Sequence, residues 1–401
     1  MSFLDLWSTI ESVGRHPGTG GYRRFAWTRE DAALREWFAS QCIARGLDLT
    51  TDRAGNQWAW WGDPDAAATA GRPGVVTGSH LDSVPDGGAF DGALGVVSAL
   101  AAVDAMRAKG VRPQRPVGVV NFGDEEGARF GVACAGSRIV TGAMTPERAR
   151  GLTDAEGVTM AEAAASAGYH PERFGRDEET VRRVGAFVEL HVEQGRGLID
   201  LDRAVAVGSS IWPHGRWRLD LLGEANHAGT TRLVDRQDPM LALATVIGAA
   251  RASAEQHGCV ATIGKLLVEP NGINAIASKV TTWLDARGPA ESDVRAIAAA
   301  VSAAGGVDAV EESFTGDTAF DRDLAEQLAA VLGDAPVIGT GAGHDAGILA
   351  AAGVRSAMLF VRNPTGISHS PAESAELDDC RAGVEALVAV LETLVGEGAP
   401  A

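Results

Sequence analysis

One loop of the sequence gathers a histidine and three aspartates between glycines, and these are side chains that can bind a divalent metal ion. The residues are His80, Asp82, Asp86 and Asp91. The β-branched run at 74–77 before the loop is typical of a buried parallel strand, and the apolar run at 92–103 after it predicts a helix. In open α/β sheets, ligands bind beyond the carboxyl ends of the strands, so the loop is predicted to be a metal site. The alternative is an ordinary turn, because Asp and Gly are enriched in turns.

Three further apolar strands are also followed by acidic or histidine side chains. The predicted strands are 117–122, 186–190 and 356–361, and the residues after them are, in order, Asp124-Glu125-Glu126, His191-Val192-Glu193 and Ser368-His369. Carboxylates and imidazoles beside buried segments need partners, and divalent cations would satisfy all of them together. The four strand ends are therefore expected to meet at one metal centre.

The length and texture of the chain predict two domains. With 401 residues the chain exceeds the size at which a single core keeps growing. A βα alternation continues to about residue 210, and the segment after it combines half-solvated strand patterns with two Ala-rich helices. We predict an α/β catalytic domain, with a mostly parallel mixed sheet flanked by helices, formed by 1–211 and 319–401. A smaller α+β lid or dimerisation domain is inserted at 212–318, and the tail after Gly396 is expected to fray.

Charge and cysteine content argue against several kinds of partner. The formal net charge is −18, and without a compensating Lys/Arg cluster the chain would repel a phosphate backbone, so no nucleic-acid partner is expected. No apolar stretch is long enough to span a membrane, and the amino terminus lacks a basic region before an apolar one, so no membrane association is expected. The four cysteines form no Cys-x-x-Cys pair, which favours reduced thiols and a cytoplasmic location.

Taken in order, the segments that carry these side chains resemble the motif set of the dinuclear-zinc amidohydrolases. That family contains N-carbamoyl-L-amino-acid hydrolases, allantoate amidohydrolases and β-ureidopropionases, and is related to aminoacylase and to carboxypeptidase-like metallopeptidases. The resemblance covers nearly the whole chain. The matching segments are 78–82, 91–92, 124–127, 189–195, 227–231, 341–346 and 366–371.

The resemblance implies two divalent metal ions in each subunit, zinc first, with manganese, cobalt or nickel as alternatives. The implied ligands are His80, Asp91, Glu126, His191 and His369. Asp91 would bridge the two ions. His80 and His191 would complete one site, and Glu126 and His369 the other. Mixed nitrogen and oxygen ligands suit such ions, which can hold one hydroxide between them. The alternative for His191 alone is a satisfied core histidine.

Catalysis is assigned to residues beside the implied ligands. Glu125 is expected to be the general acid/base, taking a proton from the bridging water and delivering it to the departing nitrogen. The alternative is that Glu125 is only a charged partner of the site. Asp82 lies two residues after His80 and is expected to orient that imidazole. The resemblance implies that the His344-Asp345 pair lies near the floor of the site, and no spacing argument gives the pair a metal of its own.

Substrate recognition is assigned mainly to the inserted domain. The resemblance implies that His227 reaches into the partner subunit of a homodimer to stabilise the tetrahedral oxyanion. It also implies that Asn274 and Arg287 hold the carboxylate of the substrate, with Gln194 assisting, and an arginine can donate two parallel hydrogen bonds to a carboxylate. Taken singly, Arg287 could equally be an exposed surface residue.

The function that these assignments predict is metal-dependent hydrolysis of the C–N bond of an N-carbamoyl or ureido carboxylate. N-carbamoyl-L-amino acids and allantoate are the two leading substrates. The alternative within enzymes is an aminoacylase or dipeptidase that acts on N-acyl amino acids or dipeptides. A non-catalytic binding protein would have no need of Glu125. Nucleotide binding is disfavoured because the glycines of the 78–88 segment do not form a Gly-x-Gly-x-x-Gly turn that opens a helix.

Overall fold

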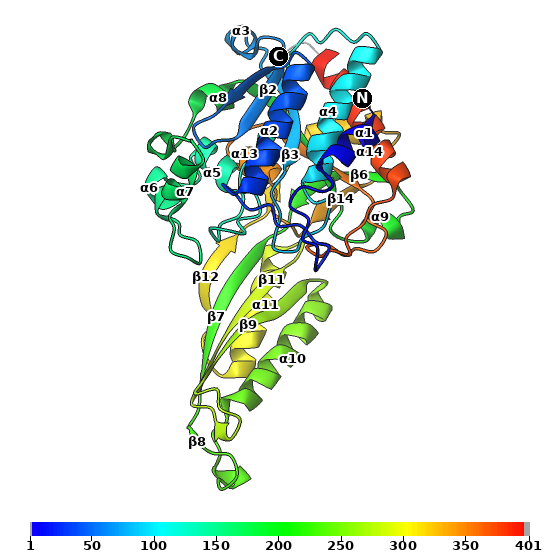
Figure 1. The fold of residues 1–401 in the computed structure, drawn as a ribbon. Helices are drawn as coiled ribbons and strands as arrows, with labels where there is room; N and C mark the ends of the chain where they lie inside the picture. Colours follow the sequence, from blue (N-terminus) through cyan, green and yellow to red (C-terminus); the bar gives the residue numbers. More distant parts are fainter. Residues whose placement is uncertain (1, 397–401) are drawn as a thin grey trace. The chain divides into compact units, whose positions relative to one another are not determined.

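A computed structural model of the protein describes residues 2–396 (Figure 1), so the predicted fraying after Gly396 lies outside the described residues. The chain divides into two compact units. The first contains Met1–Ser209 and Ala319–Ala401, and the second is Ser210–Thr318, which starts two residues before the predicted insert. Each unit has a sheet and a core of its own, and each is described by itself below.

The first unit contains a mixed nine-stranded sheet in the order β1-β2-β4-β3-β5-β15-β6-β13, with β14 paired to β6. Its four central strands, β4, β3, β5 and β15, are parallel, while β2 and β6 join them in antiparallel orientation. This arrangement confirms the predicted α/β class. The strands are β1 (Asp48–Thr51), β2 (Gln57–Trp61), β3 (Gly74–His80), β4 (Val117–Phe122), β5 (Val184–Val192), β6 (Val205–Ile211), β13 (Thr318–Ala319), β14 (Val337–Thr340) and β15 (Ser356–Val361).

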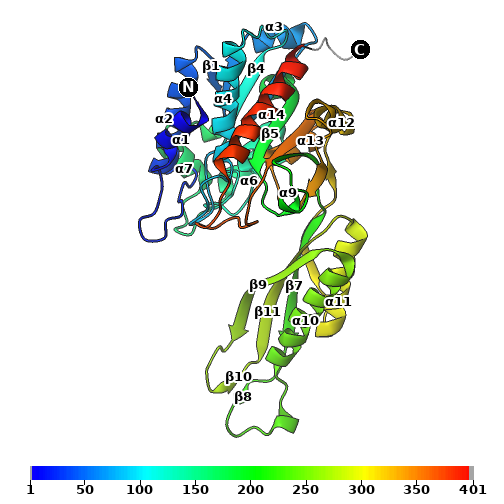
Figure 2. The same ribbon diagram turned by 90° about the vertical axis from the view of Figure 1, so that its right-hand side faces the viewer.

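Helices flank this sheet, and the central strands are buried on both faces. Every residue of β3, β4 and β15 is buried, which is why these strands read as continuous apolar runs. Helix α4 packs on β3, and α14 lies beside α4 and packs on β15 (Figure 2). The helices are α1 (Phe3–Ile10), α2 (Arg29–Ala44), α3 (Pro64–Thr69), α4 (Ala93–Ala108), α5 (Ala135–Thr141), α6 (Pro146–Gly151), α7 (Met160–Ser166), α8 (Glu178–Arg182), α9 (Gly197–Asp200), α12 (Arg322–Val331), α13 (Asp345–Ala351) and α14 (Leu377–Gly396), with a 3₁₀ turn η1 (Pro171–Arg173).

The second unit is a four-stranded antiparallel sheet with two helices packed against it. The strand order is β12-β7-β11-β9, and a separate ribbon pairs β8 with β10. Residues along β7 alternate between buried and accessible, as expected for a sheet with one covered face. The elements are β7 (His214–Leu222), β8 (Asn226–His227), η2 (Leu233–Asp235), α10 (Pro239–His257), β9 (Val260–Glu269), β10 (Ala275–Ile276), β11 (Lys279–Arg287), α11 (Glu291–Gly305) and β12 (Val310–Thr315).

None of the helices in the described part of the chain combines the length and the apolarity that crossing a membrane requires.

Candidate metal centre and active site

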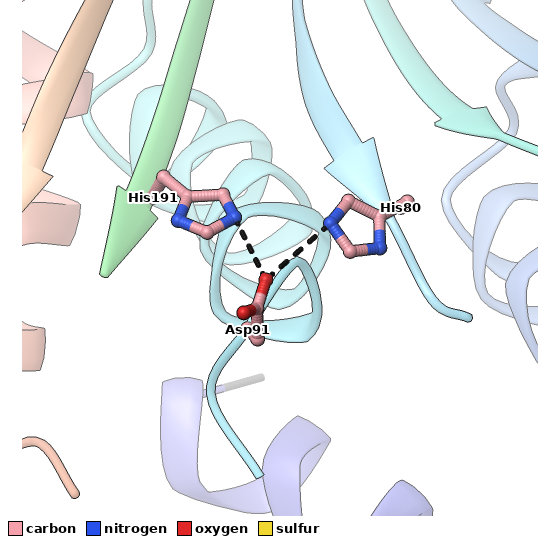
Figure 3. A group of neighbouring side chains, drawn as sticks. All are labelled: His80, Asp91 and His191. Carbon is pink, nitrogen blue, oxygen red and sulfur yellow. Dashed lines mark ion pairs between the residues drawn. The ribbon is translucent and has the colours of Figure 1, made fainter. Parts of the chain in front are cut away.

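The carboxyl ends of the central strands bring together a first group of side chains that could hold a metal ion. His80 ends β3, His191 lies near the end of β5, and Asp91 lies just before α4 (Figure 3). Asp91 Oδ1 is 3.1 Å from Nε2 of His191 and 3.6 Å from Nε2 of His80. All three residues are buried. One carboxylate oxygen therefore faces two imidazole nitrogens.

A second group shares the same aspartate. Asp91 Oδ2 is 3.5 Å from Nε2 of His369, and that nitrogen is 3.6 Å from Oε2 of Glu126. The two oxygens of Asp91 thus face different groups. Asp91 therefore belongs to both groups, which is the arrangement that the bridging role implied for it would require.

The backbone around the site explains how these side chains come so close. Gly92 begins α4 with φ of +64°, and an added Cβ there would lie 2.3 Å from the ring of His80. Only glycine lets the start of this helix approach the histidine so closely. His369 has φ of +54° in the loop after β15, a left-handed conformation that non-glycine residues adopt where their surroundings fix it, commonly at functional sites.

Hydrogen bonds at Nδ1 hold the imidazoles of His80 and His191 so that their Nε2 atoms face Asp91. Nδ1 of His191 donates to the carbonyl oxygen of Val192 at 2.9 Å, and Nδ1 of His80 donates to the carbonyl oxygen of Asp82 at 3.2 Å. Each Nε2 then carries its lone pair, and in His191 this nitrogen accepts a hydrogen bond from the amide of Gly92 at 3.2 Å. Among the described residues, Nε2 of His80 is buried and has no hydrogen-bond partner. A cation beside this nitrogen would supply the missing partner, so the donor set fits a metal.

The charges of the site also favour a cation. Burial raises the pKa of Glu125 well above its usual range. Burial and the charge of Asp91 raise the pKa of Glu126 to about 8. Burial acts to raise the pKa of Asp91 as well, but the neighbouring imidazoles of His191 and His80 hold it well below its usual value. Divalent cations beside these three buried carboxylates would compensate their negative charge and stabilise their ionised forms.

Glu125 lies beside the first group of candidate metal ligands but is a member of neither group. Its Oε2 is 3.6 Å from Nε2 of His80, and its Oε1 accepts a hydrogen bond from Sγ of Cys134 at 3.2 Å. Asp82 fixes the neighbouring backbone, because its carboxylate accepts hydrogen bonds from the amides of Glu125 at 3.1 Å and Glu126 at 3.0 Å. Oδ1 of Asp82 is also 3.5 Å from Nδ1 of His80, so this side chain contacts both that imidazole and the loop that carries the two glutamates.

Gln194 also faces the centre. Its Nε2 donates to Oδ2 of Asp91 at 2.9 Å, and its Oε1 is buried with no hydrogen-bond partner among the described residues. His344 lies behind the first group, with its ring 4.5 Å from that of His191. Burial holds the pKa of His344 well below its usual value, so the ring is neutral. The next residue, Asp345, accepts a hydrogen bond from Ser137.

The remaining candidates belong to the second unit, which brings two of them together. The backbone carbonyl oxygen of Asn274 accepts a hydrogen bond from the amide of Ala228, the residue after His227. His227 and Asn274 are both exposed. Nδ1 of His227 accepts hydrogen bonds from the amides of Gly229 and Thr230 at 3.0 and 3.2 Å. Arg287 ends β11 and donates to Asp285 at 2.8 Å. Because β11 has nine residues, about 26 Å of strand separates Arg287 from the end of the sheet that adjoins His227 and Asn274.

Three further residues contact the centre, although no role was expected for them from the sequence. Ser368 and Glu373 interact with the Asp91 loop, and Cys134 contacts Glu125. Ser368 and Glu373 lie beside His369 in one short loop, and this proximity was the available signal. The role of Cys134 depends on a left-handed backbone turn, with φ of +55°, that no local motif indicated.

An α/β sheet that gathers histidines and carboxylates at its strand ends around a shared aspartate defines a metal-dependent hydrolase. The chain belongs to Peptidase family M20/M25/M40, whose profile matches residues 76–393. It is 36% identical to an N-carbamoyl-L-amino acid amidohydrolase of Geobacillus stearothermophilus, with 95% of this chain and 96% of the relative covered. It is 31% identical to an allantoate amidohydrolase of Escherichia coli K12, with 96% and 95% covered. The crystal structure of a hydantoinase/carbamoylase family amidase from Burkholderia ambifaria matches with a TM-score of 0.83, 31% identity and 99% and 98% coverage. The family suggested by the motifs is thereby confirmed.

Proposed function

We propose that the protein is an amidohydrolase that cleaves the C–N bond of an N-carbamoyl or ureido group on a small carboxylate. The single observation that carries this proposal is the placement of Asp91 between two groups of candidate metal ligands, with Glu125 beside them. Relatives that match nearly the whole chain are named for activity on N-carbamoyl-L-amino acids or allantoate, and these are the two substrates we favour.

The proposed cofactor is a pair of divalent cations, zinc first and manganese, cobalt or nickel as alternatives. His80, Asp91 and His191 would hold one, and Asp91, Glu126 and His369 the other. Divalent cations in such a site supply Lewis acidity and lower the pKa of water.

The chain's own residues then move the proton and hold the geometry. Glu125 takes a proton from the attacking water and delivers it to the departing nitrogen, a role that fits a carboxylate 3.6 Å from Nε2 of His80 that is not itself one of the candidate ligands. Asp82 keeps the backbone of Glu125 in place through the hydrogen bond to its amide. Gln194, whose amide nitrogen is held by Asp91, keeps a buried carbonyl oxygen for a donor on the substrate.

We propose a homodimer in which the second units meet. Strand β9 is at the edge of its sheet, with unpaired backbone groups. Large apolar side chains are exposed on β9 and on α10, and an exposed apolar edge of this kind favours pairing with a second copy. These side chains are Met240, Leu241, Ile247, Val260, Leu266 and Leu267.

In this dimer, His227 and Asn274 act together in the active site of the partner subunit. The length of β11 supports an assignment of Arg287 to the other subunit. About 26 Å of strand lies between Arg287 and the end of the sheet that adjoins His227 and Asn274, so the insert of one subunit cannot bring all three to the same substrate carboxylate. His227 would stabilise the oxyanion, and Asn274 and Arg287 would bind the carboxylate from different subunits.

The free state of all four cysteines fits the reducing cytoplasm that the sequence indicated.

Mixing two inactive variants tests the shared site. His227→Ala and Glu125→Gln homodimers should each be nearly inactive, but a re-dimerised equal mixture should regain about one quarter of the wild-type rate. The reason is that half of the dimers are then mixed, and each has one site with an intact Glu125 and an intact His227 from its partner. Activity is measured before and after dissociation and reassociation. If His227 served its own subunit, the mixed dimer would contain no complete site and no activity would return.

A substrate panel tests the reaction itself. Purified protein, supplied with zinc or manganese, is assayed for ammonia or free amine with N-carbamoyl-L-amino acids, allantoate, β-ureidopropionate, N-acetyl amino acids and dipeptides. We expect turnover of a ureido compound that chelation abolishes and added metal restores. Faster turnover of acetyl or peptidyl amides would favour the aminoacylase or dipeptidase alternative and refute the proposed substrate class.

A further inference from the structure

Glu373 is a buried carboxylate that ties the loop of His369 to the loop of Asp91. Its side chain is 6% exposed. Oε1 accepts hydrogen bonds from the backbone amides of Phe90 at 2.8 Å and Asp91 at 3.0 Å. Oε2 accepts a hydrogen bond from the hydroxyl of Ser368 at 3.2 Å. One side chain thus holds both the main chain of Asp91 and the residue before His369.

Ser368 extends this link to the carboxylate of Asp91. Its Oγ is 3.4 Å from Asp91 Oδ2 and accepts a hydrogen bond from Nε2 of Gln194 at 3.2 Å. The same Nε2 donates to Asp91 Oδ2 at 2.9 Å. Oδ2 of Asp91, the oxygen that faces His369, is therefore contacted by both Gln194 and Ser368. The position of Ser368 helps to set the orientation of this oxygen.

The two loops are in direct contact at Glu373. An added Cβ on Gly88 would lie 2.2 Å from Oε1 of Glu373, so the backbone of the Asp91 loop packs directly on this carboxylate. On the other side, the amide of Glu373 donates to the carbonyl oxygen of Ser370 at 3.0 Å, which closes a turn directly after His369. The left-handed backbone of His369 needs a surrounding structure that fixes it, and the docked Glu373 anchors the loop that carries it.

We propose that Glu373 is a positioning residue for the metal centre. It fixes Asp91 between the two groups and holds His369 against Glu126, so that the second cation binds in full only when Glu373 is docked. This inference rests on the proposed two-metal function. The first group, His80, Asp91 and His191, keeps ligands that Glu373 does not contact through their side chains.

The test compares Glu373→Ala with Glu373→Gln and with Glu376→Ala, an exposed glutamate in the same loop. Zinc per chain is measured by mass spectrometry across a series of buffered zinc concentrations, and kcat is measured at saturating zinc. We expect the wild type to bind two ions. Glu373→Ala should bind one ion as the wild type does and the other about 10- to 100-fold more weakly. Glu373→Gln retains an oxygen for both amides, so it should recover most of the lost affinity, and Glu376→Ala should match the wild type.

A folded Glu373→Ala protein that binds both ions with wild-type affinity would overturn the inference. If that variant does not fold, Ser368→Ala decides, because it removes the hydroxyl through which Oε2 of Glu373 is linked to Asp91 Oδ2 and Gln194, and it leaves both amide bonds of Glu373 in place. Weaker binding of one ion in Ser368→Ala supports the inference, and unchanged binding of both overturns it. A wild-type protein that fails to bind two ions would instead refute the two-metal proposal, and this inference with it.

Discussion

Glu125→Gln is expected to lower kcat about 10²- to 10⁴-fold while the protein keeps its metal and its fold. The substitution keeps the shape of the side chain and removes its ability to accept a proton. Glu125 belongs to neither group of candidate ligands, so the affinity for metal should hardly change. Because the lost interaction acts on the reaction step, KM should change far less than kcat.

The contacts of Glu125 make this substitution a clean one. The side chain is buried, with Sγ of Cys134 at one oxygen and Nε2 of His80 near the other. A glutamine amide can occupy the same space and keep its carbonyl oxygen toward Cys134. The carboxylate of Asp82 still accepts from the amide at position 125, so the backbone of the loop is held as before.

The measurement combines steady-state kinetics on the best substrate of the panel with metal content and thermal unfolding. Glu147→Gln is the matched control, because the Glu147 side chain is 77% exposed and pairs with Arg150. It should behave as the wild type. A Glu125→Gln enzyme with a near-native kcat would show that another group moves the proton, whereas loss of metal would show that Glu125 is a ligand.

The main features of the fold and the site could be predicted because they depend on local patterns. Strands β3, β4 and β15 are buried at every position, so they appear in the sequence as short apolar runs. Parallel strands end on the same side of a sheet, and for this reason the polar residues after each run could be expected to meet. His80 and His191 are placed by this rule alone.

The interactions between loops could not be predicted in the same way. Glu373 reaches the amides of Phe90 and Asp91 across 283 and 282 positions of the sequence, and no period or motif encodes such a contact. The separation of Asn274 from Arg287 is a further example. The two residues are close in sequence, but β11 runs between them, so their separation within one subunit could be recognised only once the strand was seen.

Asp91→Asn is expected to remove both metal ions together and to reduce hydrolysis below detection. Oδ1 of Asp91 faces His80 and His191, and Oδ2 faces His369, so each group loses its shared anionic ligand. Without a bound cation, water keeps a pKa of about 15.7 in place of about 7, and the nucleophile becomes scarce at neutral pH. This effect is larger than that of Glu125→Gln, which leaves the metal in place.

Joint loss of the two ions is what distinguishes a bridging aspartate from an ordinary ligand. Metal per chain and ureido hydrolysis are measured for Asp91→Asn beside Asp86→Asn, a control in the same loop. Asp86 pairs with Arg23 at 2.9 Å at a partly exposed position, and losing such a pair costs about 0–1 kcal/mol. Asp86→Asn should therefore keep both ions and its activity. If Asp91→Asn loses one ion and keeps the other at wild-type affinity, Asp91 serves a single site and the bridged arrangement is wrong.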